Sequence, residues 1–511
     1  MSSSAERPSP GGSSPDSPSG GSAALNPKVI GISIAAAVGG FLFGFDTSVI
    51  NGAVNALSDE FSLGAGLTGF AVSSALIGCA VGAWFTGGLA NRFGRVPVMV
   101  IAAVLFFASA VGSGLAVGVW DLIAWRLLGG LGVGAASVIA PAYIAEVAPA
   151  KYRGRLGSLQ QLAIVLGIFT ALLSNALLAD VAGGSAEQLW LGVDAWRWMF
   201  MIEAVPAAIY GIMALRLPES PRYLVGKGDL DKASKILYDF TGELDVNLKI
   251  DQIRTSLEQE QRETFRDLLG ERFGLRPIVW IGILLSLFQQ LVGINVIFYY
   301  STTLWQAVGF QESDSFLISV ITAMTNIAAT IIAIMLIDRV GRRRLLLIGS
   351  AIMTASLGTM AFAFAQADII NDVPVLPGSW GPIALVAANL FVIGFGISWG
   401  PTVWVMLGEM FPNRIRAYAL GVGAAAQWLA NFVVSATFPS LADAGLQLAY
   451  GLYGFFALVS FVFVYFLVPE TNGKQLEAMG EDALGHSAPK TARPSNQKNM
   501  KPRPTTAPDP V

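Results

Sequence analysis

Five polar side chains interrupt an otherwise apolar run at residues 285–303, namely Gln289, Gln290, Asn295, Tyr299 and Tyr300. The run is long enough to cross a bilayer, so each amide in it needs a partner. On one straight helix, at roughly 100° per residue, Gln290 and Asn295 would point about 140° apart. Gly293 offers a break, and membrane carriers build midplane binding sites from discontinuous helices that line a polar cavity. The run therefore predicts one wall of a substrate site.

A second set of residues is charged. Asp46, Arg126 and Glu203 lie in three separate apolar segments, and a rise of about 1.5 Å per residue places them at a similar depth. An unpaired charge there costs roughly 2.5–3.5 kcal/mol on insertion scales, so we expect Asp46 to pair with Arg126. A carboxylate in this place loses its charge when it takes up a proton, which suits proton transport. The alternative is a static salt bridge that holds the helices together.

The composition indicates a polytopic membrane protein. Of 511 residues, 54% are hydrophobic and 13% are charged, with a mean hydropathy of +0.59, whereas about a quarter of a soluble domain is charged. Cys79 and His486 are each the one residue of their type, which argues against disulfides and histidine-rich metal sites. We therefore expect no metal and no cofactor, and proton chemistry based on carboxylates. The sequence has no nucleophile motif or phosphate loop, which argues against an enzyme, and a net charge of −3 does not indicate nucleic acid.

Twelve apolar segments follow one another, and each can span roughly 30 Å of hydrocarbon. They cover residues 29–53, 67–90, 97–116, 121–145, 156–179, 197–216, 275–304, 317–338, 344–365, 383–410, 415–437 and 447–468. The fold class expected is an all-α membrane protein of twelve transmembrane helices.

The signs of the loop charges predict the orientation. Connections after even-numbered segments carry Lys and Arg, as at 91–95, 151–155 and 342–344, whereas the opposite connections contain acids and neither Lys nor Arg. By the positive-inside rule both termini are cytoplasmic. No charged and then apolar signal peptide precedes the first segment, and the expected location is the plasma membrane.

The chain divides into five parts by composition. We expect a disordered tail at 1–27, a six-helix half at 28–216, a cytoplasmic helical linker at 217–274, a second six-helix half at 275–469 and a tail at 470–511. The tails lack the large apolar side chains that would order them. The linker is either an inert tether or a gate and brace beneath two moving halves.

An internal repeat relates the two halves. Residues 91–95 (NRFGR) mirror 338–342 (DRVGR), and PES at 218–220 mirrors PET at 469–471. The Glu146–Arg153 spacing recurs as Glu409–Arg416. Matches in the same order indicate two parallel six-helix units. We expect the repeated charges to form pairs that close the inward mouth in one state, unless they are only topology signals. These predicted gating charges are Arg92, Glu146, Arg153, Asp338, Arg339, Glu409 and Arg416.

With these motifs together, the chain resembles the sugar porter family of the major facilitator superfamily, including bacterial proton-coupled glucose and xylose symporters and facilitative glucose transporters. The matching strings are NRFGR at 91–95, PESPR at 218–222, QQLVGIN at 289–295, DRVGRR at 338–343, SWGPTVW at 398–404, AAQWLAN at 425–431 and PETNG at 469–473. The resemblance covers everything except the tails. Asn91 departs from the Asp that is usual in the superfamily's loop, which weakens one inner charge pair.

The resemblance implies a sugar site in the interface between the halves. Its residues are Gln161, Gln289, Gln290, Asn295, Asn326, Gly400, Trp404, Gln427 and Trp428, with Phe43 as an apolar wall. Neutral amides both donate and accept hydrogen bonds, and aromatic rings cover the C–H face of a sugar, so the residue types fit a neutral polyol. For each residue alone, bonding to a neighbouring helix or packing at the interface is the alternative.

The resemblance also bears on energy coupling and selectivity. Proton-coupled members carry Asp at the position of Asp46, where facilitators commonly have Asn, so symport is favoured over facilitated diffusion. A non-transporting sugar sensor is a third possibility, although sensors usually carry a longer cytoplasmic extension. Ile168 shares a face of its segment with Gln161, and hexose carriers have isoleucine there, which favours glucose or a close aldohexose over xylose. The expected partners are a monosaccharide, a proton and the lipid bilayer, and the expected functional unit is a monomer.

Overall fold

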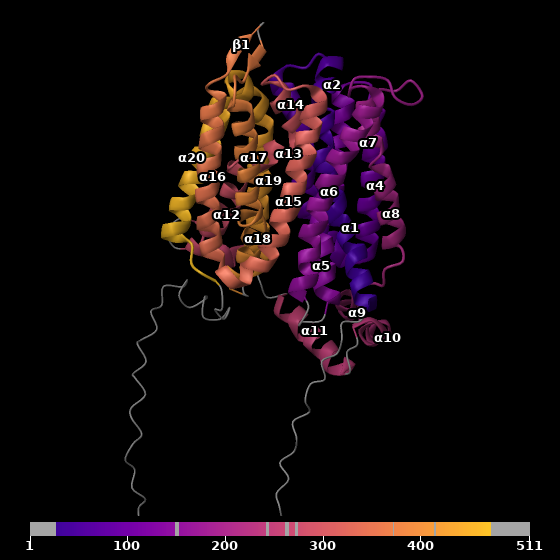
Figure 1. Ribbon diagram of the computed structural model, residues 1–511. Coiled ribbons are helices and arrows are strands. Elements are labelled where there is room, and N and C mark those ends of the chain that lie inside the picture. Colours follow the sequence, from indigo (N-terminus) through magenta and orange to yellow (C-terminus); the bar gives the residue numbers. More distant parts are fainter. Residues whose placement is uncertain are drawn as a thin grey trace, which may run out of the picture.

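The computed structural model describes residues 27–148, 153–241, 245–260, 265–270, 274–370, 373–412 and 415–471. The two predicted tails therefore lie almost wholly outside the described residues. Two helical bundles stand side by side, and a group of short helices lies beneath one end of them (Figure 1). We call this the linker end and the opposite end the distal end. The first and last described helices, α1 and α20, both begin or finish at the linker end (Figure 1).

The N-terminal half is built from the first six apolar segments. Its elements are α1 (Pro27–Val49), η1 (Ile50–Gly52), α2 (Val54–Glu60), α3 (Ala65–Phe93), α4 (Arg95–Gly114), α5 (Val119–Val147), α6 (Arg153–Ala182), α7 (Ala195–Met201) and α8 (Ala204–Ala214). Glycines allow these helices to pack closely. A Cβ atom at Gly130 would collide with the carbonyl oxygen of Ala75, and one at Gly134 with that of Cys79, so α3 and α5 lie backbone to backbone.

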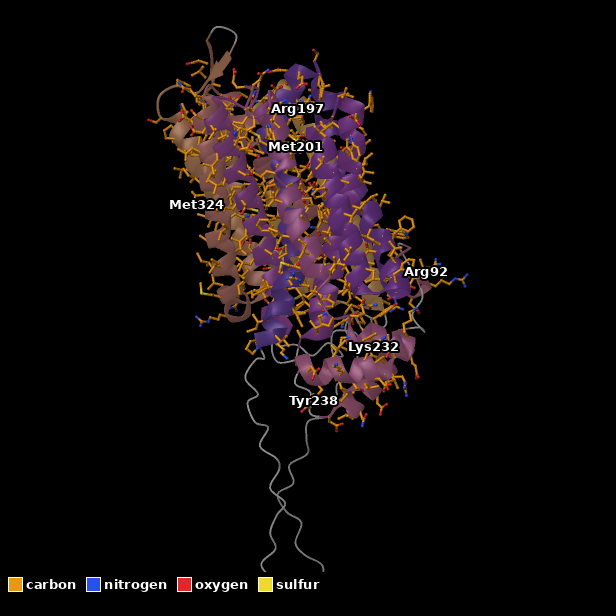
Figure 2. The ribbon with its side chains drawn as sticks, turned by 90° about the vertical axis from the view of Figure 1, so that its right-hand side faces the viewer. Arg92, Arg197, Met201, Lys232, Tyr238 and Met324 are labelled. Carbon is orange, nitrogen blue, oxygen red and sulfur yellow. The ribbon has the colours of Figure 1, made fainter. Side chains whose placement is uncertain are left out.

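The linker elements are α9 (Pro221–Lys227), α10 (Leu230–Ile236), η2 (Leu237–Thr241), α11 (Val246–Glu260) and η3 (Phe265–Leu268). Helix α9 starts where the Ser220 hydroxyl accepts a hydrogen bond from the backbone N–H of Tyr223 and proline occupies the first turn. The group has a small apolar core of its own, formed by Leu224, Val225, Ala233, Leu237 and Ile250. Lys232 and Tyr238 lie on this group, below the bundles (Figure 2).

The C-terminal half repeats the plan. Its elements are α12 (Pro277–Leu291), α13 (Ile294–Tyr299), α14 (Ser301–Gln306), α15 (Glu312–Val340), α16 (Arg342–Phe364), β1 (Asp368–Ile370), β2 (Val373–Val375), α17 (Trp380–Gly396), α18 (Trp399–Met410), α19 (Arg416–Ala444) and α20 (Leu446–Leu467). The strands form an antiparallel hairpin at the distal end, with Ile369 opposite Pro374 (Figure 1).

Eleven of the described helical stretches are long and apolar enough to cross a membrane. The exception among the twelve expected segments is 197–216, which the structure divides into α7 and α8 at Ile202 and Glu203. Pro206 explains the break, because its nitrogen cannot donate to the carbonyl oxygen of Ile202. Pro401 likewise cannot donate to the carbonyl oxygen of Ile397. There the structure divides the expected segment 383–410 into α17 and α18. The sequence analysis predicted the spans of these two segments but not the breaks within them.

Hydrogen bonds join the two halves at the distal end. The Asn51 amide donates to the carbonyl oxygen of Phe298 at 3.0 Å, and the Thr302 hydroxyl donates to that of Asn51 at 2.6 Å. One turn further on, Asn55 donates to Gln306 at 2.8 Å. The backbone N–H of Ser185 donates to the carboxylate of Glu312 at 3.1 Å. The first three bonds join η1 and α2 to α13 and α14, and the fourth joins the loop after α6 to the start of α15.

Candidate functional site

The break after α12 gathers the amides of the predicted site. Gly293 has a φ of +81°, and a Cβ atom there would lie 2.6 Å from the ring of Tyr453, so both backbone and packing favour glycine. The turn brings Asn295 back to Gln290, to which its amide donates at 2.6 Å. A straight helix would have pointed these two side chains apart. The break that Gly293 allows is what makes them neighbours.

The amide chain continues into the break between α17 and α18. Gln290 donates to Gln289 at 3.4 Å, and Gln289 donates to the carbonyl oxygens of Trp399 at 3.0 Å and Gly400 at 3.2 Å. Trp399 and Gly400 are the first two residues of α18, directly after the break. Gln289 and Gln290 are buried, whereas Asn295 is partly exposed. Segments seven and ten are thus linked by amides that can exchange these bonds for bonds to a polar ligand.

Asn326 lies beside the end of α17, and an aromatic pair joins the two halves. A Cβ atom on Gly396, at the end of α17, would lie 3.3 Å from the carbonyl oxygen of the Asn326 side chain. The rings of Phe43 on α1 and Trp428 on α19 are 5.7 Å apart between centroids, so they form a contact between the halves. The aromatic pair thus lies at the interface between the halves, whereas the contacts of the amides lie within the C-terminal half.

Four further residues predicted for the sugar site lie outside the chain of hydrogen-bonded amides. Gln161 and Ile168 on α6 and Gln427 on α19 are partly buried, and Gln427 Oε1 is buried without a hydrogen-bond partner among the described residues. Trp404 on α18 has 42% of its surface exposed. The structure shows no hydrogen bond that joins any of these four described residues to the amide chain. A role for them in binding stays a prediction.

The charged cluster is buried in the N-terminal half. Arg126 Nη1 donates to Asp46 Oδ1 at 3.2 Å and to the Asp46 carbonyl oxygen at 3.0 Å, and the two side chains are 2% and 1% exposed. Glu203 lies at the break between α7 and α8 and is equally buried. Asp46 Oδ2 and Glu203 Oε1 accept no hydrogen bond from a described group. The N-terminal half therefore buries two carboxyl groups together with one guanidinium group, a set that membrane proteins keep for function rather than for packing.

Glycine and aromatic neighbours shape this cluster. A Cβ atom on Gly129 would lie 3.2 Å from Asp46 Oδ1, so glycine leaves room for the carboxylate. The guanidinium carbon of Arg126 lies 5.7 Å from the centre of the Phe200 ring. The cation is therefore held between a carboxylate and an aromatic face.

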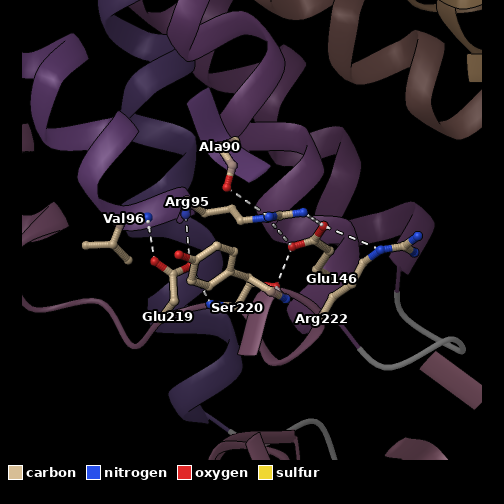
Figure 3. Close-up of polar contacts among 8 residues, drawn as sticks. Ala90, Arg95, Val96, Glu146, Glu219, Ser220 and Arg222 are labelled. Carbon is tan, nitrogen blue, oxygen red and sulfur yellow. Dashed lines mark hydrogen bonds and ion pairs between the residues drawn. The ribbon is translucent and has the colours of Figure 1, made fainter. Parts of the chain in front are cut away.

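A second charged network lies at the linker end of the N-terminal half (Figure 3). Arg95 binds Glu146 through two bonds of 2.9 and 2.8 Å. The Glu219 carboxylate accepts the backbone N–H groups of Arg95 at 3.0 Å and Val96 at 3.2 Å, and the Ser220 hydroxyl donates to Glu146. The prediction named Arg92 and Arg153 as partners of this kind. Arg92 instead points away from the bundle (Figure 2), and the side chain of Arg153 lies outside the described residues.

The same network recurs in the C-terminal half. Arg342 donates to Glu409 at 2.9 Å, and the Glu470 carboxylate accepts the backbone N–H groups of Arg342 at 3.0 Å and Arg343 at 3.1 Å. The Thr471 hydroxyl donates to Glu409 at 2.6 Å. The internal repeat found in the sequence is therefore a repeat of atomic contacts.

In the C-terminal half, too, the arginine that binds the glutamate is not among the predicted gating charges. Arg339 is exposed, and Arg416 donates to the carbonyl oxygen of Phe411 at the end of α18. The side chain of Asp338 lies outside the described residues. Of the two arginines of the repeated loop motif, the last one, Arg95 or Arg342, binds the glutamate in each half; Arg222 also lies 4.0 Å from Glu146. The sequence signal for this ion pair was the loop motif itself, which contains both arginines.

A bundle of broken membrane helices, with a buried charged cluster in one half and a chain of hydrogen-bonded amides in the other, defines a membrane transporter and not an enzyme. The profile of the family described as "Sugar (and other) transporter" matches residues 32–483. The chain therefore belongs to this family of sugar transporters, within the major facilitator superfamily.

Known proteins agree with this assignment. The chain is 57% identical to the glucose transport protein of Synechocystis sp. over 453 residues, which are 88% of this chain and 97% of that protein. It is 37% identical over 484 residues to the D-xylose-proton symporter of Escherichia coli K12, covering 88% and 95%. Among solved structures, a partially occluded inward-open conformation of the xylose transporter XylE from E. coli aligns with a TM-score of 0.76 at 36% identity, covering 88% of this chain and all of that one. The fold is thus that of the twelve-helix transporters.

Proposed function

We propose that this protein moves a monosaccharide together with a proton by alternating access, and that glucose or a close aldohexose is the favoured sugar. The observation that carries the proposal is the buried cluster of Asp46, Arg126 and Glu203 in a sugar transporter fold. The names of two relatives, a glucose transport protein and a D-xylose-proton symporter, support the sugar and the coupling respectively.

Sugar recognition rests on the amide chain. A sugar hydroxyl both donates and accepts, so it can replace the bond between Asn295 and Gln290 and bond to each amide in turn. The paired rings of Phe43 and Trp428 offer an apolar face for the C–H surface. We assign Gln161, Ile168, Asn326, Gly400, Trp404 and Gln427 to the same site.

Proton coupling follows from the preference of each state for one protonation form. The loaded carrier crosses when Asp46 is neutral, and the empty carrier returns once the proton has left and Asp46 pairs again with Arg126. One proton that moves down ~150 mV supplies about 3.5 kcal/mol, which supports a sugar gradient of roughly a few hundredfold.

We assign the linker end to the cytoplasm of a cell whose plasma membrane holds the protein, with a monomer as the functional unit. The arginine-rich loops at this end support the orientation. Because hydrogen bonds fasten the halves together at the distal end, this conformation corresponds to a carrier closed towards the outside. The two networks around Glu146 and Glu409 each lie within one half, and we propose that they hold that half rigid as the inner mouth opens and closes.

The test is uptake of radiolabelled glucose and xylose into proteoliposomes that contain the purified protein, with and without an inward proton gradient. The expected result is accumulation of glucose above its external concentration, which a protonophore abolishes. Equilibration without accumulation under every gradient would instead make the protein a facilitator. Binding of sugar without any flux would make it a sensor.

A further inference from the structure

Two consecutive glycines on α1 face buried polar side chains. A Cβ atom on Gly39 would lie 2.8 Å from the hydroxyl oxygen of Tyr210 on α8, and one on Gly40 would lie 2.6 Å from Nε2 of Gln160 on α6. Tyr210 is 0% exposed and Gln160 is 8% exposed. Neither the Tyr210 hydroxyl nor Gln160 Oε1 has a hydrogen-bond partner within the part of the chain that the structure describes.

The register of the helices relates Tyr210 to the charged cluster. Gly39 precedes Asp46 by seven residues on α1, and Tyr210 follows Glu203 by seven, where Glu203 itself has helical backbone angles. Seven residues are two helical turns, about 10 Å. Tyr210 therefore lies on the same side of its helix as Glu203, two turns closer to the linker end.

A buried hydroxyl without a partner is costly, and phenylalanine would fill the same space without that cost. A bridging water is the usual partner of such a group. Elsewhere in the chain a buried hydroxyl has its partners within the protein, as Ser350 does with Ser460 at 2.9 Å and with the Trp399 indole at 2.9 Å. Water is therefore the partner that we expect for the Tyr210 hydroxyl.

We propose that Tyr210 is a step in the route by which the transported proton leaves the Asp46–Glu203 pair towards the linker end. The proton passes from the carboxyl group along a chain of water molecules to the Tyr210 oxygen, while the phenolic proton passes to the next water towards the linker end. Tyr210 ends neutral, and Asp46 ends as the carboxylate that Arg126 binds. The linker end is the exit in this conformation because the distal end is closed between the halves.

This inference rests on the proposed proton coupling, and the experiment separates the two. Tyr210→Phe is compared with Tyr450→Phe in proteoliposomes. Tyr450 also has a buried hydroxyl without a partner among the described groups, but it lies on α20 against Phe364, with ring centroids 5.2 Å apart. We measure sugar uptake driven by a proton gradient, proton flux with a pH-sensitive dye, and sugar exchange between preloaded vesicles.

In Tyr210→Phe, gradient-driven uptake and proton flux should fall roughly three- to tenfold, the size of one lost hydrogen bond, while exchange stays at the wild-type rate. Tyr450→Phe should leave all three unchanged. Wild-type proton flux in Tyr210→Phe would overturn the inference and leave the coupling intact. A wild-type protein without gradient-driven accumulation would overturn the proposed function instead.

If Tyr210→Phe fails to insert, Gly39→Ala decides, because it keeps the hydroxyl but places a methyl group against it. The expected result is again slow proton flux with normal exchange, and an unaltered proton flux would overturn the inference.

Discussion

The two halves share one plan and one charge network, yet their interiors differ in chemistry. Between α1, α5 and the α7–α8 break, the N-terminal half buries Asp46, Arg126 and Glu203. In the described C-terminal half the corresponding interior holds neutral amides, with Gln289 and Gln290 buried at 2% and 6% exposure. A proton needs a site that can change its charge, whereas a sugar needs groups that donate and accept at constant charge. The duplication thus allows each half to specialise.

Removing the charge from the N-terminal cluster should have the largest effect. We expect Asp46→Asn to abolish accumulation against a gradient and to spare sugar exchange between preloaded vesicles, because only the net movement of protons needs a titratable group. The measurement is uptake with and without an inward proton gradient. Concentrative uptake by this variant would move the coupling role to Glu203.

Changing the amide chain in the other half should act on affinity and not on coupling. Gln290→Ala should raise the half-saturating sugar concentration several-fold, since one hydrogen bond to a neutral partner is worth about 0.5–1.5 kcal/mol. Trp404→Ala should act in the same direction if its exposed ring meets the sugar. The proton-to-sugar ratio should not change.

Asn389 is a matched control for this experiment. It is an amide on α17 that donates to the carbonyl oxygen of Leu385 in its own helix at 3.0 Å. Asn389→Ala should leave the kinetics at wild-type values. Unchanged kinetics in Gln290→Ala and Trp404→Ala would place the sugar elsewhere.

A smaller effect, on selectivity, is expected at Ile168. An apolar wall suits the hydroxymethyl group of a hexose, whereas a polar side chain demands a partner in a particular direction. Competition of unlabelled glucose and xylose against labelled glucose should favour glucose in the wild type, and Ile168→Gln should shift the preference towards xylose by a few-fold. Faster transport of xylose by the wild type would refute the hexose assignment.

The smallest effect is expected on thermal stability, when the charge networks of the two halves are compared. Glu146 has a side-chain exposure of 12% and Glu409 one of 32%. Arg95→Gln should therefore destabilise the detergent-solubilised protein more than Arg342→Gln does, by about 1 kcal/mol, since a more buried carboxylate loses more when its partner is removed. Thermal unfolding of both variants measures this. Equal shifts would mean that the difference in exposure between Glu146 and Glu409 does not affect stability.

The sequence alone determined the features that depend on local chemistry. Apolar length predicted the spans, and Gly293 predicted the break that the structure contains, because both follow from the preferences of a few adjacent residues in a bilayer. The pairing of Asp46 with Arg126 could be predicted as well, since a buried charge needs an opposite charge at the same depth. The repeat was visible because its motifs are short and contiguous.

Only the tertiary structure decided which side chains meet across helices. Arg92 and Arg95 flank the end of one helix at Gly94, whose φ of +104° turns the chain, and that turn directs Arg95 to Glu146 and Arg92 outwards. The bonds of Asn51 and Asn55 to α13 and α14 join residues about 250 positions apart. The close approach of Gly39 to the Tyr210 hydroxyl likewise depends on the packing of α1 against α8. Such contacts follow from the relative rotation and depth of whole helices, which no local pattern specifies.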